Sequence, residues 1–519
     1  PLELPPGRGG FGPRLTLSYS SASVDWPARS WDPNVQAGWV GYGWSLEGSY
    51  IGRQNVGGHA WTGDAKTCQQ VATPYAGGDV YNLVLNGSGN DLVSGTDGYY
   101  HAAAESFAQG WNSGGDDPEG WYARTTDGAV YSFTTRLWQL DCDSDCSEHP
   151  REWDHQVYKW LLTEARDTHG NTIHYTYTLS TVNCPNPGGS GTLDCQEAYY
   201  LSSIGYNDAG GTALMRVEFV LGDREDDYYA PPDATRCPAK FLQKKKLDQV
   251  EVHVGGELAW EYRFDYDYLL EDDDLTPGGV VWEKLTLLGV QRCGTNDDGG
   301  TFTCLPATRF GYYGLGELGT PQVGRNRLFT ATNGYGGVVT YTYEVASEIN
   351  NWRNRVVERA VDDGLGQVAT WSYDYSLAQR NSPYIVDTAC DGLSADAGTN
   401  RPRTSPMREF RGHAAVTVTD PLDNVQVHHF HLDDTYRGQP AGTRQFDDLG
   451  NLYQVITPTH ATYAFTATAY PAQGYTFATP EIAFTYVATE TTATCDGATP
   501  CQVRRTLSLI HISEPTRPY

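Results

Sequence analysis

Alternating apolar and polar side chains dominate the chain, and the pattern is clearest in residues 166–177. Gly170 and Asn171 can adopt the positive φ values of a two-residue primed turn, which joins antiparallel strands. Successive side chains of a strand point to opposite faces. One face of the strand after this turn carries Ile173, Tyr175 and Tyr177, and the other carries Thr172, His174 and Thr176. The stretch therefore predicts one arm of a β-hairpin.

The same unit recurs further along the chain. Counted from the turn glycine, the recurrences are Gly336 with Val339, Tyr341 and Tyr343, and Gly366 with Ala369, Trp371 and Tyr373. Two variants follow at 420–424, where Asp423 replaces the glycine, and at 447–451. Unrelated turns would not share aromatic offsets, so these units indicate an internal repeat. The residues expected in the repeat turns are Gly170, Asn171, Gly336, Gly366, Asn424, Gly450 and Asn451.

The composition favours the same fold class. The 519 residues include 57 glycines and 35 tyrosines but only 2 methionines, as expected of many turns and half-buried strands. Further hairpin signals occur, such as the strands predicted at 250–254 and 258–266 on either side of Gly255-Gly256. A helical apolar period is nowhere sustained beyond about three turns. We therefore predict an all-β protein.

The charge balance excludes several classes of partner. With 36 basic and 64 acidic residues, the formal net charge is −28. Such a surface repels phosphate backbones and anionic lipid heads, so we expect no nucleic-acid binding. No apolar run approaches the ~18 residues of a membrane helix, so we expect no membrane insertion by this segment.

Eleven cysteines fall largely into local pairs. The disulfide candidates are Cys142 with Cys146, Cys184 with Cys195, Cys293 with Cys304, and Cys495 with Cys501. Zinc binding is the alternative for Cys142 and Cys146, with His149 as a third ligand. Disulfides across hairpins are the favoured interpretation and imply an oxidising, extracellular environment.

Candidate chemistry is sparse. Acidic clusters at 223–227, 271–274 and 297–298 fit solvated turns better than a calcium loop, because no closing glutamate stands at the required spacing. The run 428–431 places His429 and His431 on one strand face, but no third ligand is evident. No nucleophile elbow is present. We therefore expect a scaffold with no catalytic residues, no metal and no cofactor.

The opening of the chain resembles a known family. A Pro-Gly-Arg-Gly lead at 6–9, a Leu-Ser-Tyr-Ser-Ser strand at 17–21 and a Gly-Trp-Ser-Leu segment at 43–46 are similar to the start of Rhs/YD-repeat shell proteins, including the SpvB-like part of toxin-complex B subunits. The Asp-x-x-Gly-Asn turns, with Tyr373-Asp374 and Phe446-Asp447 in the Tyr-Asp position, resemble YD repeats. The resemblance covers most of residues 1–506.

This resemblance implies a large curled antiparallel sheet of successive hairpins, with an SpvB/Rhs-like region at 1–325 and the first YD-type repeats at 326–506. In such proteins, bacterial polymorphic toxins among them, the sheet forms a shell around the protein's own C-terminal toxin domain, and the whole is secreted or displayed at the cell surface. A secretion apparatus or a target-cell surface is then a further partner. Two alternatives stay open: a secreted carbohydrate-binding or carbohydrate-cleaving β-protein, and a surface adhesin.

The last thirteen residues, 507–519, have a different origin in our interpretation. They resemble an in-frame translation of a transposon-end adaptor used in sequencing libraries. We exclude them from the fold prediction and expect them to lie loosely. We also expect the natural reading frame to continue past Thr506.

Overall fold

A computed structural model provides the structure. It describes residues 1–24, 37–46, 48–54, 80–94, 98–102, 108–115, 118–140, 155–185, 192–209, 212–225, 243–272, 281–295, 302–313, 327–346, 354–376, 378–380, 410–433, 436, 438–465, 482–495 and 501–507. Within these ranges the chain is built of strands, with two short 3-10 turns at Arg8–Gly10 and Ser21–Val24. The predicted all-β class is confirmed. None of the helices in the described ranges is long and apolar enough to span a membrane.

The first strands form a closed circuit in which each strand pairs antiparallel with the next and β10 pairs back onto β3. The circuit consists of β3 (Tyr50–Gln54), β4 (Val80–Leu85), β5 (Ser88–Ser94), β6 (Tyr100–Ala102), β7 (Gln109–Asn112), β8 (Trp121–Arg124), β9 (Val130–Leu140) and β10 (His155–Arg166). Its own apolar core is centred on Trp121, Trp160, Phe133 and Ile51, all fully buried.

From the end of β10 a long antiparallel ribbon continues the sheet. Its strands are β11 (Thr172–Pro185), β12 (Thr192–Ala209), β13 (Thr212–Asp223), β14 (Lys245–Val254), β15 (Glu257–Asp272), β16 (Val281–Thr295), β17 (Phe302–Cys304), β18 (Thr308–Tyr312), β19 (Leu328–Thr332), β20 (Val338–Val345), β21 (Asn354–Asp362), β22 (Val368–Tyr375), β25 (Ala415–Thr419), β26 (Val425–Phe430), β27 (Pro440–Phe446), β28 (Leu452–Phe465), β29 (Ile482–Thr494) and β30 (Gln502–Leu507). Strand pairing is continuous across the expected boundary at residue 325, and that boundary stays a prediction.

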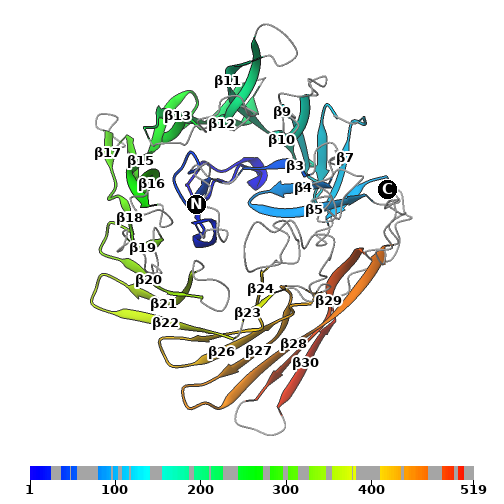
Figure 1. Cartoon of the computed structure of the whole chain (residues 1–519), viewed down its shortest axis with the longest axis vertical. Coiled ribbons are helices and arrows are strands. Elements are labelled where there is room, and N and C mark those ends of the chain that lie inside the picture. The colour runs from blue at the N-terminus through cyan, green and yellow to red at the C-terminus, as the bar shows by residue number, and fades with distance from the viewer. Residues whose placement is uncertain are drawn as a thin grey trace, which may run out of the picture.

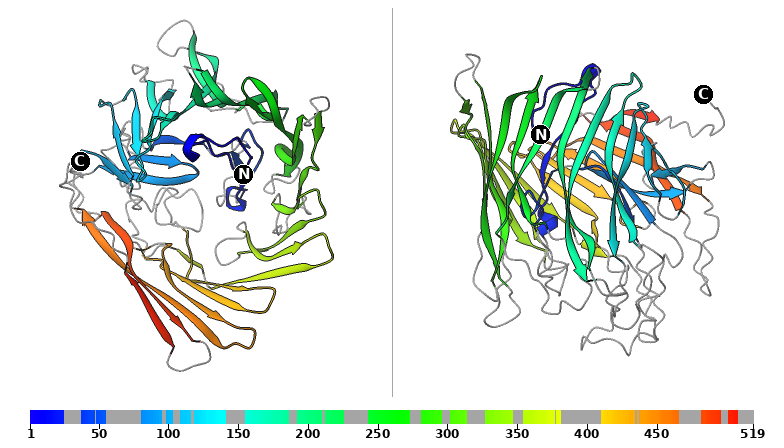
Figure 2. Two further views of the ribbon diagram at one scale, coloured as in Figure 1. Left: turned by 180° about the vertical axis from the view of Figure 1, so that it is seen from behind. Right: turned by 90° about the horizontal axis from the view of Figure 1, so that it is seen from above.

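The ribbon curls around the molecule and surrounds the N-terminal segment, which lies inside the curve (Figure 1). The view from behind shows the same arrangement, and the view from above shows the strands standing side by side (Figure 2). Two further strand pairs lie apart from the ribbon ladder: β1 (Leu17–Tyr19) with β2 (Trp44–Leu46), and β23 (Ala378–Arg380) with β24 (Phe410–His413). The large curled antiparallel sheet expected from the family resemblance is therefore present.

Repeated β-bulges interrupt the ladder. At five of them, a tyrosine hydroxyl on the adjacent strand donates a hydrogen bond to a backbone carbonyl of the bulge. A bulge leaves one residue out of register, bends its strand and disrupts the ladder locally. At Leu328, for example, register is lost between Gly311 and Tyr312 of the partner strand, and Phe329 is left unpaired. The hydroxyl of Tyr343, on the other neighbouring strand, donates a hydrogen bond to the Leu328 carbonyl. We call this arrangement a tyrosine clamp.

The same arrangement recurs at the carbonyl just before each bulged residue. Each tyrosine hydroxyl and its acceptor carbonyl are Tyr177 with Leu162 (2.8 Å), Tyr266 with Leu247 (2.8 Å), Tyr312 with Leu287 (2.5 Å), Tyr343 with Leu328 (3.0 Å) and Tyr375 with Val356 (2.6 Å). Burial raises the pKa of all five hydroxyls, so they stay protonated and act as donors. The clamps thus satisfy carbonyls that the bulges would otherwise leave without a partner.

Replacing a clamp tyrosine tests its contribution. Tyr343→Phe keeps the buried ring but leaves the Leu328 carbonyl without its donor, so we expect a loss of about 1–3 kcal/mol in the free energy of unfolding. Tyr341→Phe, two residues earlier on the same strand, is the matched control and should change stability by less than about 0.5 kcal/mol. Urea unfolding of the two variants measures the difference. Equal effects would contradict the clamp.

Candidate functional site

The repeat turns are the first candidate site, because they are the feature that recurs most clearly along the sequence. In the turn after β10, the Asp167 carboxylate accepts hydrogen bonds from the backbone N–H groups of His169 (2.9 Å) and Asn171 (2.8 Å). Its second oxygen accepts one from the Asn171 side chain at 2.6 Å. The Asp167 N–H in turn donates to the Asn171 carbonyl, and the Gly170 N–H donates to the Asp167 carbonyl. The turn is therefore closed by its own aspartate.

This geometry corrects the predicted turn type. The strands end at Arg166 and resume at Thr172, so the loop between them holds five residues rather than the predicted two. Of the pair expected at positive φ, Gly170 has φ 84° and Asn171 does not have a positive φ. The prediction failed because it treated Asn171 as a backbone element, whereas its side chain is the partner of Asp167.

The other predicted turn residues take equivalent places. Asp420 and Asp447 accept side-chain hydrogen bonds from Asn424 (2.9 Å) and Asn451 (3.0 Å). Asn333 and Asp363 accept backbone N–H bonds at the start of the two remaining turns. The residues at the glycine position, all with positive φ, are Gly336 (98°), Gly366 (97°), Asp423 (63°) and Gly450 (81°). Asp423 thus does adopt the conformation of the glycine it replaces.

The pKa values of three turn aspartates, Asp167, Asp420 and Asp447, are lowered, which favours their ionised form. The hydrogen bond from the Asn424 side chain lowers the pKa of Asp420, and that from the Asn451 side chain lowers the pKa of Asp447. At Asp167, desolvation raises the pKa, but the hydrogen bonds from Asn171 outweigh it and the pKa is lowered. Hydrogen bonds to a carboxylate favour its charged form, which explains the common direction.

The second candidate site is the N-terminal segment inside the curve, residues 1–24 and 37–46, which we call the strap. Leu2, Leu15 and Val40 of the strap are buried against the inner face of the ribbon, in one core with Leu247 and Leu287. Burial of each such side chain contributes roughly 1.5–3 kcal/mol. The strap therefore covers a sheet face that would otherwise meet water.

Hydrogen bonds also fix the strap in place. On its first arm, the hydroxyl of Tyr206 donates to the Pro5 carbonyl at 2.7 Å, and Tyr262 accepts from the Glu3 N–H at 2.7 Å. The opening motif fits this path closely, because a Cβ on Gly7 would lie 1.7 Å from the carbonyl oxygen of Phe11. Only glycine is accommodated there without a backbone shift. Gly7, which belongs to the Pro-Gly-Arg-Gly lead of the family resemblance, thus sets the backbone path of the strap.

The second arm of the strap connects to the clamps. Trp44 donates its indole N–H to the hydroxyl of Tyr312 at 2.7 Å, and Tyr312 itself clamps the Leu287 carbonyl. The hydroxyl of Tyr19 accepts a hydrogen bond from the Leu328 N–H at 3.0 Å. Strap and ribbon therefore share one hydrogen-bonded network on the inner face.

Two of the predicted cysteine pairs are disulfide-bonded. Cys293 and Cys304 are direct cross-strand partners with Cα atoms 3.9 Å apart, and Cys495 and Cys501 have Cα atoms 4.2 Å apart. Both separations are slightly shorter than the usual ~4.4–6.8 Å. In the backbone register Cys184 pairs with Leu193 and Cys195 with Val182. The side chains of Cys184 and Cys195 lie outside the described part, as do Cys142, Cys146 and most of the tail 507–519.

The histidine run is partly explained by the structure. His428 contacts the hydroxyl of Thr443 at 3.2 Å, and His431 lies just beyond the end of β26. The ring of His431 packs edge-on against His460 of β28, a residue that the sequence spacing did not single out. Burial, followed by the nearby His431, lowers the pKa of His460, so the His460 ring favours its neutral form. The arrangement is that of a packed aromatic contact.

Comparison with solved structures identifies the fold. The crystal structure of TcdB2-TccC3-TEV matches with a TM-score of 0.57 at 11% identity, over 95% of this chain and 41% of that chain. TcdB2-TccC3 without its hypervariable C-terminal region matches with a TM-score of 0.56 at 10% identity, over 94% and 41%. The Photorhabdus luminescens Tc holotoxin pore with the TccC3-D651A mutation matches at 0.51 and 10% identity, over 94% and 40%.

The chain thus has the fold of part of TcdB2-TccC3 and spans about two fifths of the length of that protein. This agrees with the Rhs/YD-repeat fold that the opening motif and the turns implied. No protein-family model matches the chain, and none of the curated proteins matches its sequence.

The lowered pKa values of Asp420 and Asp447 predict that acid destabilises their hairpins. Their folded-state pKa values lie below the unfolded value near ~3.9, so their contribution to stability is complete above that pH and is lost as the pH falls through the folded pKa. Asp447→Asn should retain the backbone caps, as Asn333 does naturally, but remove this pH dependence. Hydrogen exchange of the Leu449 and Asn451 amides between pH 2 and 6 measures it. An unchanged pH dependence in the variant would contradict the assignment.

Proposed function

We propose that the chain is a non-catalytic scaffold segment of a secreted Rhs/YD-repeat toxin, forming part of a shell around a C-terminal toxin domain outside this sequence. The observation that carries the proposal is the continuous ribbon that curls around its own strap. Its match to TcdB2-TccC3 over 95% of the chain supports the same function. One of the matched structures is described as lacking a hypervariable C-terminal region, as a variable enclosed domain would require.

The physical properties of the ribbon suit a container. Apart from the short β17, each ribbon strand from β10 to β29 pairs with a strand on either side, so few hydrogen-bonding edges of the described ribbon are exposed to other chains. Five clamps and the strap stiffen the curve, and two disulfides fit an oxidising exterior. These properties suit a segment that holds its shape, and in this proposal catalysis, where present, belongs to another part of the protein.

Protection of the enclosed domain tests this function. The complete gene product is digested with a nonspecific protease, and the survival of its C-terminal region is followed by mass spectrometry. We expect that region to survive in the intact protein and to be cut quickly when expressed alone, because a shell excludes the protease. Equal cutting rates would contradict the shell. Retention of the intact protein on immobilised glycans would instead favour the carbohydrate-binding alternative, and a C-terminal wall anchor would favour an adhesin.

A further inference from the structure

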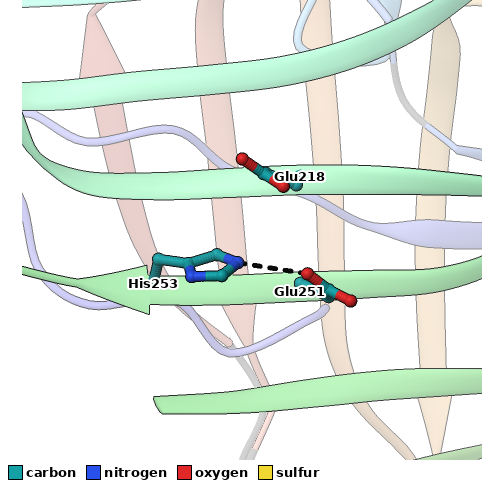
Figure 3. A group of neighbouring side chains, drawn as sticks. All are labelled: Glu218, Glu251 and His253. Atoms are coloured by element: carbon teal, nitrogen blue, oxygen red, sulfur yellow. Dashed lines mark hydrogen bonds and ion pairs between the residues drawn. The ribbon is translucent and has the colours of Figure 1, made fainter. Parts of the chain in front are cut away.

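Three side chains converge on the face of β13 and β14 that points away from the core. Val217, Val250 and Val252 of these strands are buried, so the alternating residues Glu218 and Glu251 face the opposite side. Figure 3 shows His253 beside Glu251 on β14, with its ring turned toward the Glu251 carboxylate. Glu218 lies on the neighbouring strand. Within the described residues this is the group whose potential metal-ligand atoms all lie within 4.8 Å of one another.

The row of carboxylates around this group is electrostatically unbalanced. Glu251 lies directly opposite Glu218 on β13 and directly opposite Glu261 on β15. Like charges directly opposite each other across a strand pair are destabilising. The two outer glutamates each have an arginine: Arg216 with Glu218 at 2.8 Å, and Arg263 with Glu261.

The central glutamate has a different neighbour. The described contact of its carboxylate is with the imidazole of His253, whose Nε2 lies 3.1 Å from a carboxylate oxygen. Glu218 and Glu251 therefore lie opposite each other on adjacent strands, with Arg216 bound to Glu218 and lying opposite His253 in the register.

The donor set indicates which cation fits. An imidazole nitrogen and two carboxylate oxygens are ligands that Zn²⁺ accepts at about 2.0–2.2 Å, whereas Ca²⁺ and Mg²⁺ prefer oxygen ligands alone. A ligand-to-ligand separation of 3.1 Å is compatible with two neighbouring positions of a tetrahedral ion. The His253 and Glu251 side chains are 20% and 24% exposed, so an ion can enter from solvent and still be partly dehydrated.

We propose that Glu218, Glu251 and His253 form a binding site for a divalent transition-metal ion, with Zn²⁺ as the best match. The ion would join β13 to β14 and neutralise the carboxylate row, with its fourth position open to water. The site stabilises the wall of the ribbon directly behind the face that the strap covers. It is independent of the shell function.

Zinc binding by the chelator-treated chain tests the site, with Zn²⁺ alone as the probe. Equilibrium dialysis should show that wild type binds one ion more than His253→Ala. The matched control is His174→Ala, because His174 also faces a glutamate across a strand pair, Glu164 at 3.7 Å, but belongs to no group of three potential ligands among the described residues. The control should bind as much zinc as wild type. Equal binding by His253→Ala and wild type, or an equal loss in both histidine variants, would overturn the proposal and indicate adventitious binding at histidines.

A second variant keeps the test decisive if His253→Ala does not fold. Glu218→Gln removes one ligand and also the repulsion from Glu251. Because it also removes the ion pair with Arg216, we expect little net change in the thermal midpoint of the metal-free protein. Zinc binding should weaken at least about tenfold, and the zinc-induced rise in that midpoint should be abolished. A zinc-induced rise of wild-type size in Glu218→Gln would contradict the site.

Discussion

The burial of the ribbon's inner face under the chain's own first residues is the interaction on which the curved fold depends. An antiparallel sheet can leave one face in water, but the other must be covered by something apolar. Here Leu2, Leu15 and Val40 supply that cover, and they come from segments some two hundred residues away from β13 and β14. The closed circuit β3–β10 has a core of its own, which meets the ribbon core at Tyr131 and Tyr175, so it depends less on the strap.

The tyrosine clamps allow the sheet to bend without leaving backbone carbonyls at the bulges without a hydrogen-bond donor. A bulge bends its strand but disrupts the ladder, and a buried carbonyl without a donor costs free energy. A tyrosine on the next strand provides the donor while its ring adds apolar surface. At each of these five positions phenylalanine could not replace tyrosine, because the hydroxyl is the donor. Through Tyr312, which both clamps a bulge and binds Trp44, the curve and the strap are connected.

Local features were predictable from the sequence, and features that need a distant partner were not. The positive φ of Gly170 and Asp423, and the hairpin at Gly255-Gly256, follow from short-range conformational preferences. The two-residue turn was wrong because Asn171 acts through its side chain. The clamp of Tyr343, the contact of His431 with His460 and the meeting of Glu218 with Glu251 depend on strand register, which no local pattern specifies. The aromatic offset after the turn glycine did signal Tyr177 and Tyr343, although not their acceptors.

The most direct measurement of the role of the strap is hydrogen exchange, resolved to individual strands, on the chain with and without residues 1–24. If the strap covers the inner face, its removal should sharply reduce amide protection in β12–β16 while protection in the circuit β3–β10 is retained, because the circuit has a core of its own. Unchanged protection in β12–β16 would contradict the account. So would an equal loss of protection in both regions, since it would show that the strap is not specific to the ribbon.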